Sequence, residues 1–209
     1  MNENEKWYGP EELVRVGCHD CAGCSSCCSG MGESIRLDPY DLYMLTSNLS
    51  VSFEELLESR IQLGMADGLI LPHIKMGETG DGSCSFLNKE GKCSIHTFRP
   101  GLCRAFPLGR DYTEGYLRYF LLENVCPARN KTKMKVQKWL EIPQYKEYQK
   151  FLTDYHYFIK ETQAKIRTEN CTIDQIRDIN TRILAKLFQK PYGESFFEEF
   201  YRRVEMIRN

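Results

Sequence analysis

Five of the ten cysteines in this chain lie in one short run, Cys18-His-Asp-Cys21-Ala-Gly-Cys24-Ser-Ser-Cys27-Cys28. The residues between them are Gly, Ser, Asp, Ala and His, most of which form polar turns, whereas a cysteine in a core is usually a single thiol among apolar neighbours. The spacing Cys-x-x-Cys lets a tight turn direct two thiolates at one ion while backbone N–H groups donate hydrogen bonds to the sulfurs. The run is therefore predicted to bind metal.

Four more cysteines follow this run at wider spacing. Cys84 and Cys93 flank a turn that contains glycine, and its two short extended arms are expected to bring both thiols together. Cys103 lies between two arginines, and Cys126 is followed by proline. We expect these four thiols to converge in space with those of Cys21, Cys24, Cys27 and Cys28. The predicted metal ligands are Cys18, Cys21, Cys24, Cys27, Cys28, Cys84, Cys93, Cys103 and Cys126.

Eight or nine thiols are more than one tetrahedral ion needs. Their number suits two four-cysteine sites, or one cluster with a separate structural zinc. Zinc favours closed cages of four thiolates, and a [4Fe–4S] cluster also takes four, often from repeated Cys-x-x-Cys steps that end in Cys-Pro. The repeated steps and the Cys126-Pro127 pair favour an iron-sulfur cluster, and zinc is the alternative.

Charged neighbours of the cysteines are expected to support the metal. Arg99, Arg104 and Arg110 are candidates to offset the negative charge of four thiolates. His19 and His96 lie close to cysteines in the sequence, and we interpret them as hydrogen-bond donors to the ligands and leave them out of the ligand set.

Composition narrows the class of protein. The formal net charge is -1, without the basic excess that binding to nucleic acid requires. No segment approaches the 18 apolar residues of a membrane span, and the first residues are polar, so we expect a cytoplasmic protein. In that reducing compartment, clustered cysteines favour metal binding over disulfides. Cys171, isolated in a helical pattern, is interpreted as a buried or free thiol.

Local patterns predict the first helices and a strand. Asp38 followed by proline indicates a helix from residue 39 to residue 47. Ser52 and Glu55 form a capping-box pattern that opens a second helix, whose apolar face is expected to include Ile61. Residues 69–74 are predicted to form a strand.

Beyond residue 131 the sequence changes from cysteine-rich to helical. Apolar residues recur at helical spacing in residues 148–159, 176–187 and 196–204. We predict two parts, a cysteine-cluster metal-binding domain in residues 1–131 and a helical extension in residues 132–209 packed on it. The predicted fold class is α+β and mostly helical, with a small, irregular cysteine-rich module that contains short strands, and C-terminal helices.

The cysteine motifs carry a resemblance to a known family. The matching elements are Cys21-x-x-Cys24-x-x-Cys27-Cys28, Cys84-Ser-Phe-Leu, Cys93-Ser-Ile-His96, Arg99-Pro100, Cys103-Arg104-x-Phe106-Pro107 and Cys126-Pro127. Together they resemble the YkgJ-type CxxCxxCC family of zinc- or iron-chelating proteins over residues 18–127. The same module is similar to the cysteine region of flagellin lysine methylases, which implies an iron-sulfur cluster.

The leading functional hypothesis is a cytoplasmic metal-binding protein that holds an iron-sulfur cluster, zinc or both, with an accessory or redox role in protein modification and a protein partner. One alternative is a protein-modifying enzyme similar to the lysine methylases. No nucleophile elbow, His-Glu-x-x-His motif or dinucleotide fingerprint supports a catalytic site in the sequence. The other alternative is a structural zinc module for protein interaction.

Overall fold

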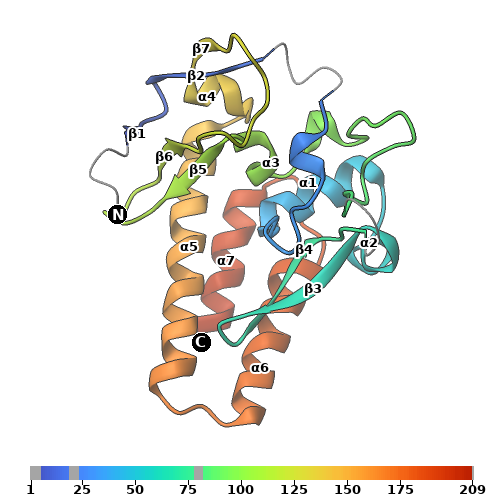
Figure 1. Cartoon of the computed structure of the whole chain (residues 1–209). Helices are drawn as coiled ribbons and strands as arrows, with labels where there is room; N and C mark the ends of the chain where they lie inside the picture. Colours follow the sequence, from blue (N-terminus) through green and yellow to red (C-terminus); the bar gives the residue numbers. More distant parts are fainter. Residues whose placement is uncertain (1–5, 19–23, 78–81, 209) are drawn as a thin grey trace.

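The structure is a computed structural model that describes residues 6–18, 24–77 and 82–208. Helices dominate, and the strands form small antiparallel sheets, which confirms the predicted α+β, mostly helical class. Figure 1 shows β1, β2, β5, β6, β7 and α4 at the top, with the long helices α5, α6 and α7 extending downward and the β3–β4 hairpin beside them.

The strands are short and pair in three groups within the described residues. The first sheet has the order β1-β6-β5, the second joins β2 to β7, and the third is the hairpin of β3 and β4. Their bounds are β1 Trp7–Tyr8, β2 Leu13–Gly17, β3 Ile61–Ala66, β4 Leu69–Ile74, β5 Leu108–Asp111, β6 Arg118–Leu121 and β7 Thr132–Lys135.

The helices have the following bounds: α1 Pro39–Leu49, α2 Phe53–Ser59, α3 Gly101–Ala105, α4 Val136–Leu140, α5 Tyr145–Thr168, α6 Ile173–Ile183 and α7 Phe196–Arg208. Two 3-10 turns, η2 Ser26–Cys28 and η3 His96–Phe98, and a π-helical segment, η4 Leu184–Gln189, complete the helical elements described.

Local sequence explains where the first helices begin. Asp38 caps the start of α1, and Ser52 and Glu55 form a capping box at the start of α2, as predicted. Asp41 completes a second capping box with Asp38, which we had not predicted. The expected contribution of Ile61 to the α2 face was wrong, because α2 ends at Ser59 and Ile61 is the first residue of β3.

The β3–β4 hairpin matches the predicted strand at residues 69–74 and adds β3, for which we had no prediction. Its two-residue turn, Asp67-Gly68, has positive φ at both positions, 49° and 83°. This conformation suits the right-handed twist of the flanking strands, and glycine adopts it without strain.

The C-terminal helices contact the β3–β4 hairpin and α1 through side-chain hydrogen bonds and aromatic rings. Gln163 of α5 donates to the Ala66 carbonyl at 3.0 Å, and Asn180 of α6 accepts from the Ile70 N–H at 2.6 Å. Tyr40 of α1 stacks on Phe197 of α7 with ring centroids 5.7 Å apart. The buried apolar residues thus form a core that continues from the short strands into the C-terminal helices.

The boundary predicted at residue 131 falls beside a strand pair. β7 begins at Thr132 and pairs with β2, so that Val14 lies opposite Met134. The division into two domains stays a prediction, and this pairing shows that the two parts share a sheet.

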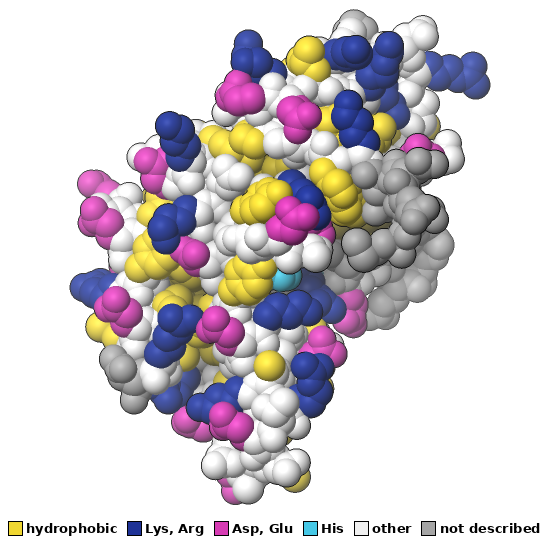
Figure 2. All heavy atoms as spheres, turned by 90° about the vertical axis from the view of Figure 1, so that its left-hand side faces the viewer, with side chains coloured by type: hydrophobic (Ala, Val, Ile, Leu, Met, Phe, Trp, Pro, Cys, Tyr) yellow, Lys and Arg dark blue, Asp and Glu magenta, His cyan; other side chains and the backbone are white. Residues whose placement is uncertain are grey.

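Figure 2 shows acidic and basic side chains mixed over one face, with Lys and Arg gathered at the upper end. No helix among the described residues is both long and apolar enough to cross a membrane.

Candidate metal centre

A small pocket of about 30 Å³ lies where three separate segments of the chain meet. These segments are the turn around η2, the loop of residues 84–93, and α3. Six of the nine predicted ligands line it: Cys24, Cys27, Cys28, Cys84, Cys93 and Cys103. The structure therefore brings together thiols that the chain separates widely.

Backbone hydrogen bonds hold the first segment against the second. The 3-10 turn η2 closes when the Cys28 N–H donates to the Ser25 carbonyl at 2.7 Å. The Cys84 N–H donates in turn to the Cys28 carbonyl, also at 2.7 Å, and Ser29 forms a β-bridge with Ser83. Main-chain contacts alone therefore hold Cys27 and Cys28 beside Cys84, and a bound metal is not required for this arrangement.

The loop of residues 84–93 turns back on itself as expected, although it forms isolated bridges and not strands. Leu87 is bridged to Cys93, and the Ser94 N–H donates to the Phe86 carbonyl at 2.9 Å. The turn passes through Gly91 at a φ of 71°, which glycine adopts readily.

The third segment, α3, is positioned by a buried carboxylate of α1. The Gly101 N–H donates to Asp41 Oδ1 at 2.7 Å, and Asp41 Oδ2 accepts from the Asp38 N–H at 3.1 Å. A Cβ at position 101 would lie 2.1 Å from Tyr148 Oη, so only glycine leaves room for this packing. Asp41 also lies in the first turn of α1. Its contact with α3, which carries Cys103, spans 60 residues and has no signal in the sequence.

The thiols that line the pocket differ in pKa. Hydrogen bonding from the Cys28 thiol lowers the pKa of Cys27 to about 7 and that of Cys93 to about 6. The same hydrogen bonds raise the pKa of Cys28, and burial raises the pKa of Cys84 and that of Cys103. The group therefore favours thiolates at two positions and protons at the other three, and a metal that binds all five would displace those protons.

Arg99 is the cation of this pocket. Its side chain is buried, lines the pocket and contributes to the lowered pKa of Cys27. The guanidinium donates to His96 Nε2, and its buried Nε has no hydrogen-bond partner among the described residues. Since His96 Nε2 accepts this bond, His96 supports Arg99 in this arrangement. His96 also lines the pocket, and its exclusion from the ligands stays a prediction.

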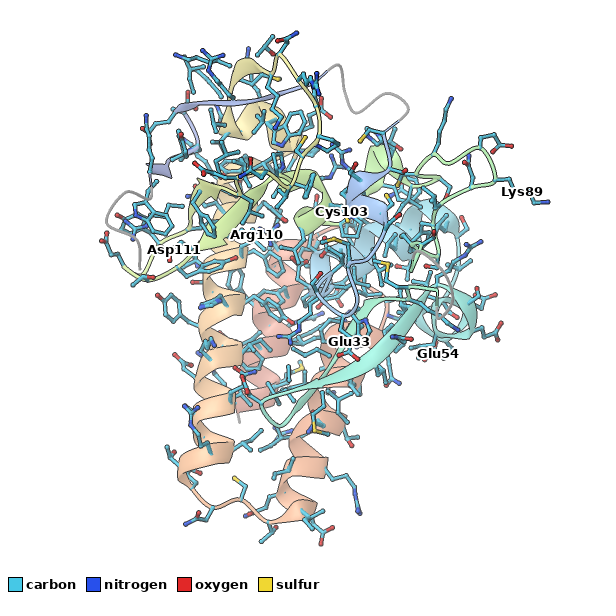
Figure 3. All side chains as sticks on the ribbon, in the orientation of Figure 1. Glu33, Glu54, Lys89, Cys103, Arg110 and Asp111 are labelled. Atoms are coloured by element: carbon cyan, nitrogen blue, oxygen red, sulfur yellow. The ribbon has the colours of Figure 1, made fainter. Side chains whose placement is uncertain are left out.

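Arg104 and Arg110 do not have the role expected for them. Arg104 is buried and donates to the carbonyls of residues 97, 99, 140 and 141. Arg110 donates to Tyr148 Oη at 3.0 Å and lines a different cavity. In Figure 3 Cys103 and Arg110 lie near the centre of the upper half, on α3 and β5. Proximity in sequence to Cys103 suggested a shared site, whereas the turn between α3 and β5 directs Arg110 elsewhere.

Two further predicted ligands, Cys18 and Cys126, are not among the described residues that line the pocket. Cys18 directly follows β2, and Cys126 lies between β6 and β7, where its carbonyl accepts from Lys131 Nζ at 3.1 Å. Cys21 and His19 lie outside the described residues. Cys171 is only partly exposed and lies between α5 and α6, away from the pocket.

The pocket suits a thiophilic metal by its chemistry. Its metal donors are six sulfurs and the imidazole of His96, with no carboxylate among the lining residues, and such sets select zinc, copper(I) or iron-sulfur clusters over calcium or magnesium. Within residues 6–18, 24–77 and 82–208, no three His, Cys, Asp or Glu side chains already have the geometry of a metal site. The sulfurs are gathered but need side-chain adjustment to close around an ion.

The fold and this pocket define an α+β protein with a cysteine-rich, metal-chelating module. The chain matches the model of the CxxCxxCC family, described as "Putative zinc- or iron-chelating domain", over residues 20–171, and it belongs to that family. The predicted resemblance is thereby confirmed, and the match continues past residue 131 through α5. No curated protein and no solved structure matches the chain.

Proposed function

We propose that this protein binds a transition metal through a thiolate centre whose core ligands come from Cys27, Cys28, Cys84, Cys93 and Cys103. The observation that carries the proposal is the convergence of these five sulfurs, from three segments, in one pocket with the buried cation Arg99. Cys27 and Cys28 Sγ are 3.8 Å apart, and Cys28 shares hydrogen bonds with both Cys27 and Cys93. A positive charge among thiolates offsets the negative charge that four of them leave on a metal.

Cys24 belongs to the outer part of this centre. It lines the pocket but is exposed, and its Sγ lies 3.6 Å from Ser26 Oγ. Cys18, Cys21 and Cys126 stay predicted ligands on the sequence pattern, as donors to a second site or to the outer side of the first.

An iron-sulfur cluster is the metal group we favour. The pocket offers more thiols than one tetrahedral ion uses, and the Cys-x-x-Cys steps and Cys-Pro ending are typical of cluster binding. With such a cluster the protein would have a redox or accessory role in protein modification, as the similarity to flagellin lysine methylases suggests.

Zinc is the second candidate, and a separate observation supports it. The pocket has a volume of only about 30 Å³, which suits a single ion better than a larger cluster. A closed four-thiolate zinc site would stabilise the fold and make the protein an interaction module.

The test combines metal analysis with matched cysteine variants of the full chain, purified without oxygen. An iron-sulfur protein should show broad visible absorption with roughly four iron and four sulfide per cluster, and a zinc protein should show no visible absorption. Cys93→Ser should lose most of the metal and unfold more easily, while Cys171→Ser should keep both metal and stability. Equal metal content in Cys93→Ser and the parent protein would contradict the proposal.

A further inference from the structure

A second cavity, of about 390 Å³, lies beside the metal pocket and is much larger. One face of α5 forms a wall, from Leu152 through Ile159 to Gln163. Opposite it lie the segment before α1, β4, α3 and β5. This volume is within the range of pockets that bind small molecules in proteins, about 300 to 1,000 Å³.

The cavity has an apolar interior. Leu37 and Leu152 are buried, and Leu71 of β4, Leu102 of α3 and Ile159 of α5 complete the apolar surface. An organic group placed here would gain from the removal of apolar surface from water. The cavity therefore suits a ligand with an apolar body.

Three cations surround this interior. Arg36 and Lys160 are exposed at the edge, and Arg110 reaches it from β5. Among the residues that the structure describes, none of the three takes part in an ion pair, although the chain has many carboxylates. Positive charges left unpaired around an apolar space favour a ligand that is an anion.

Arg110 is the most informative of the three. One of its terminal nitrogens donates to Tyr148 Oη, while its buried Nε has no hydrogen-bond partner in the described part of the chain. A buried donor without a partner costs free energy, and a bound acceptor would recover it. A guanidinium binds carboxylate and phosphate oxygens through parallel hydrogen bonds.

The cavity is lined by fewer acidic than basic side chains. Asp67 is exposed at the edge, and Asp38 is buried, where burial and the charge of Asp41 raise its pKa to about 8. His156 stacks on Tyr112 with ring centroids 4.0 Å apart, and burial lowers its pKa. Two carboxyl groups therefore face the three cations, and the buried Asp38, which interacts electrostatically with Arg110, forms no ion pair with it among the described residues.

We propose that this cavity binds a small organic anion, a molecule with an apolar body and a carboxylate or phosphate group that Arg110 holds. The cavity is separate from the metal centre, but the wall between them is thin. Leu102 and Arg36 line the cavity, while their sequence neighbours Cys103 and Ile35 line the metal pocket. The bound anion would lie on the opposite side of α3 from the thiols.

The probes for the test are 1-naphthoate and its neutral analogue of similar shape, 1-naphthamide. Binding of each to the full-length protein, with its metal as purified, is measured by calorimetric titration at about pH 7. The parent protein should bind naphthoate roughly tenfold more tightly than naphthamide, the fold-change that corresponds to about 1.4 kcal/mol. Absence of naphthoate binding, or equal affinity for both probes, would overturn the proposal.

Variants locate the site. Arg110→Gln should abolish the preference for naphthoate and keep the affinity for naphthamide, and Lys160→Gln should lower naphthoate affinity about threefold. Arg129→Gln is the control, because Arg129 is exposed, lies outside the cavity and has no ion pair in the described residues. If Arg110→Gln does not fold, the double variant Arg36→Gln with Lys160→Gln replaces it, and this variant should also lower the preference for naphthoate over naphthamide. Unchanged preference in the folded cavity variants would place the probe elsewhere and refute the site.

Discussion

The surroundings of a few buried side chains determine whether these side chains are protonated. The Cys28 thiol stays protonated and donates hydrogen bonds to the sulfurs of Cys27 and Cys93, which become easier to ionise. Asp38 and Asp41 are buried together at the start of α1, where each accepts a backbone N–H from the other. Hydrogen bonds set the protonation of the thiols, whereas burial is the main cause of the raised pKa of Asp38.

Asp38 makes the stability of the fold depend on pH. Its pKa is raised from 3.8 to about 8 in the folded protein, mainly by burial, so the folded state keeps a proton that the unfolded chain loses. Stability from this group is fully present below about pH 4 and is lost as pH rises towards and through 8. Asp38→Asn keeps the helix-cap acceptor but cannot ionise, so its melting temperature should fall less between pH 5 and pH 8.

Thermal unfolding at the two pH values measures this difference. Asp178→Asn, at an exposed position of α6, serves as the control and should follow the parent protein. A decrease in Asp38→Asn as large as that of the parent would show that Asp38 does not carry the effect.

Short elements in this fold are joined by buried arginines that donate to carbonyl groups. Arg104 connects the segment before α3 to the end of α4. Arg203 of α7 donates to the carbonyls of Lys186, Lys190 and Pro191 at 2.8, 2.6 and 2.5 Å. Because the last carbonyls of a helix have no partner within it, Arg203 stabilises the end of the π-helical segment η4.

Adjacent arginines on α7 give a matched test of this role. Both pair with Glu199 Oε1, but Arg203 is buried at 2.6 Å, whereas Arg202 is largely exposed at 3.5 Å. Arg203→Met should lower the free energy of unfolding by about 3 kcal/mol, because buried carbonyls and a carboxylate lose their partner. Arg202→Met should lower it by about 0.5 kcal/mol or less. Urea denaturation distinguishes these values, and similar small losses in both would contradict the role of Arg203.

At the scale of the whole molecule, the cysteine-rich part and the helical part support each other. β2 obtains its partner strand from β7, and Tyr40 of α1 packs among Tyr148, Phe151 and Phe196 of α5 and α7. The family match spans the same junction. These contacts indicate that the metal pocket depends on residues beyond 131.

Truncation tests this dependence. A chain of residues 1–131 would lack β7 and would expose the apolar surface that α5 and α7 cover, so it should not unfold cooperatively even with metal added. Circular dichroism during thermal unfolding, compared with the full chain, provides the measurement. A sharp transition and retained metal in residues 1–131 would instead support two independent domains.

The sequence alone predicted what depends on neighbouring residues. The N-cap at Asp38, the capping box at Ser52, the helical patterns of α5, α6 and α7, and the strand at residues 69–74 all follow from local turn chemistry and apolar spacing. Cysteine spacing likewise predicted the metal-binding class, because thiolates at Cys-x-x-Cys intervals have few other uses in a reducing compartment.

Only the tertiary structure decided which distant groups meet. It gathered Cys27, Cys93 and Cys103 in one pocket, left Cys126 outside the lining, and directed Arg104 and Arg110 away from the sulfurs. These outcomes depend on packing between segments far apart in the chain, such as the bond from Gly101 to Asp41. A contact of that kind leaves no periodic signal in the sequence, because its geometry is fixed only when the core closes.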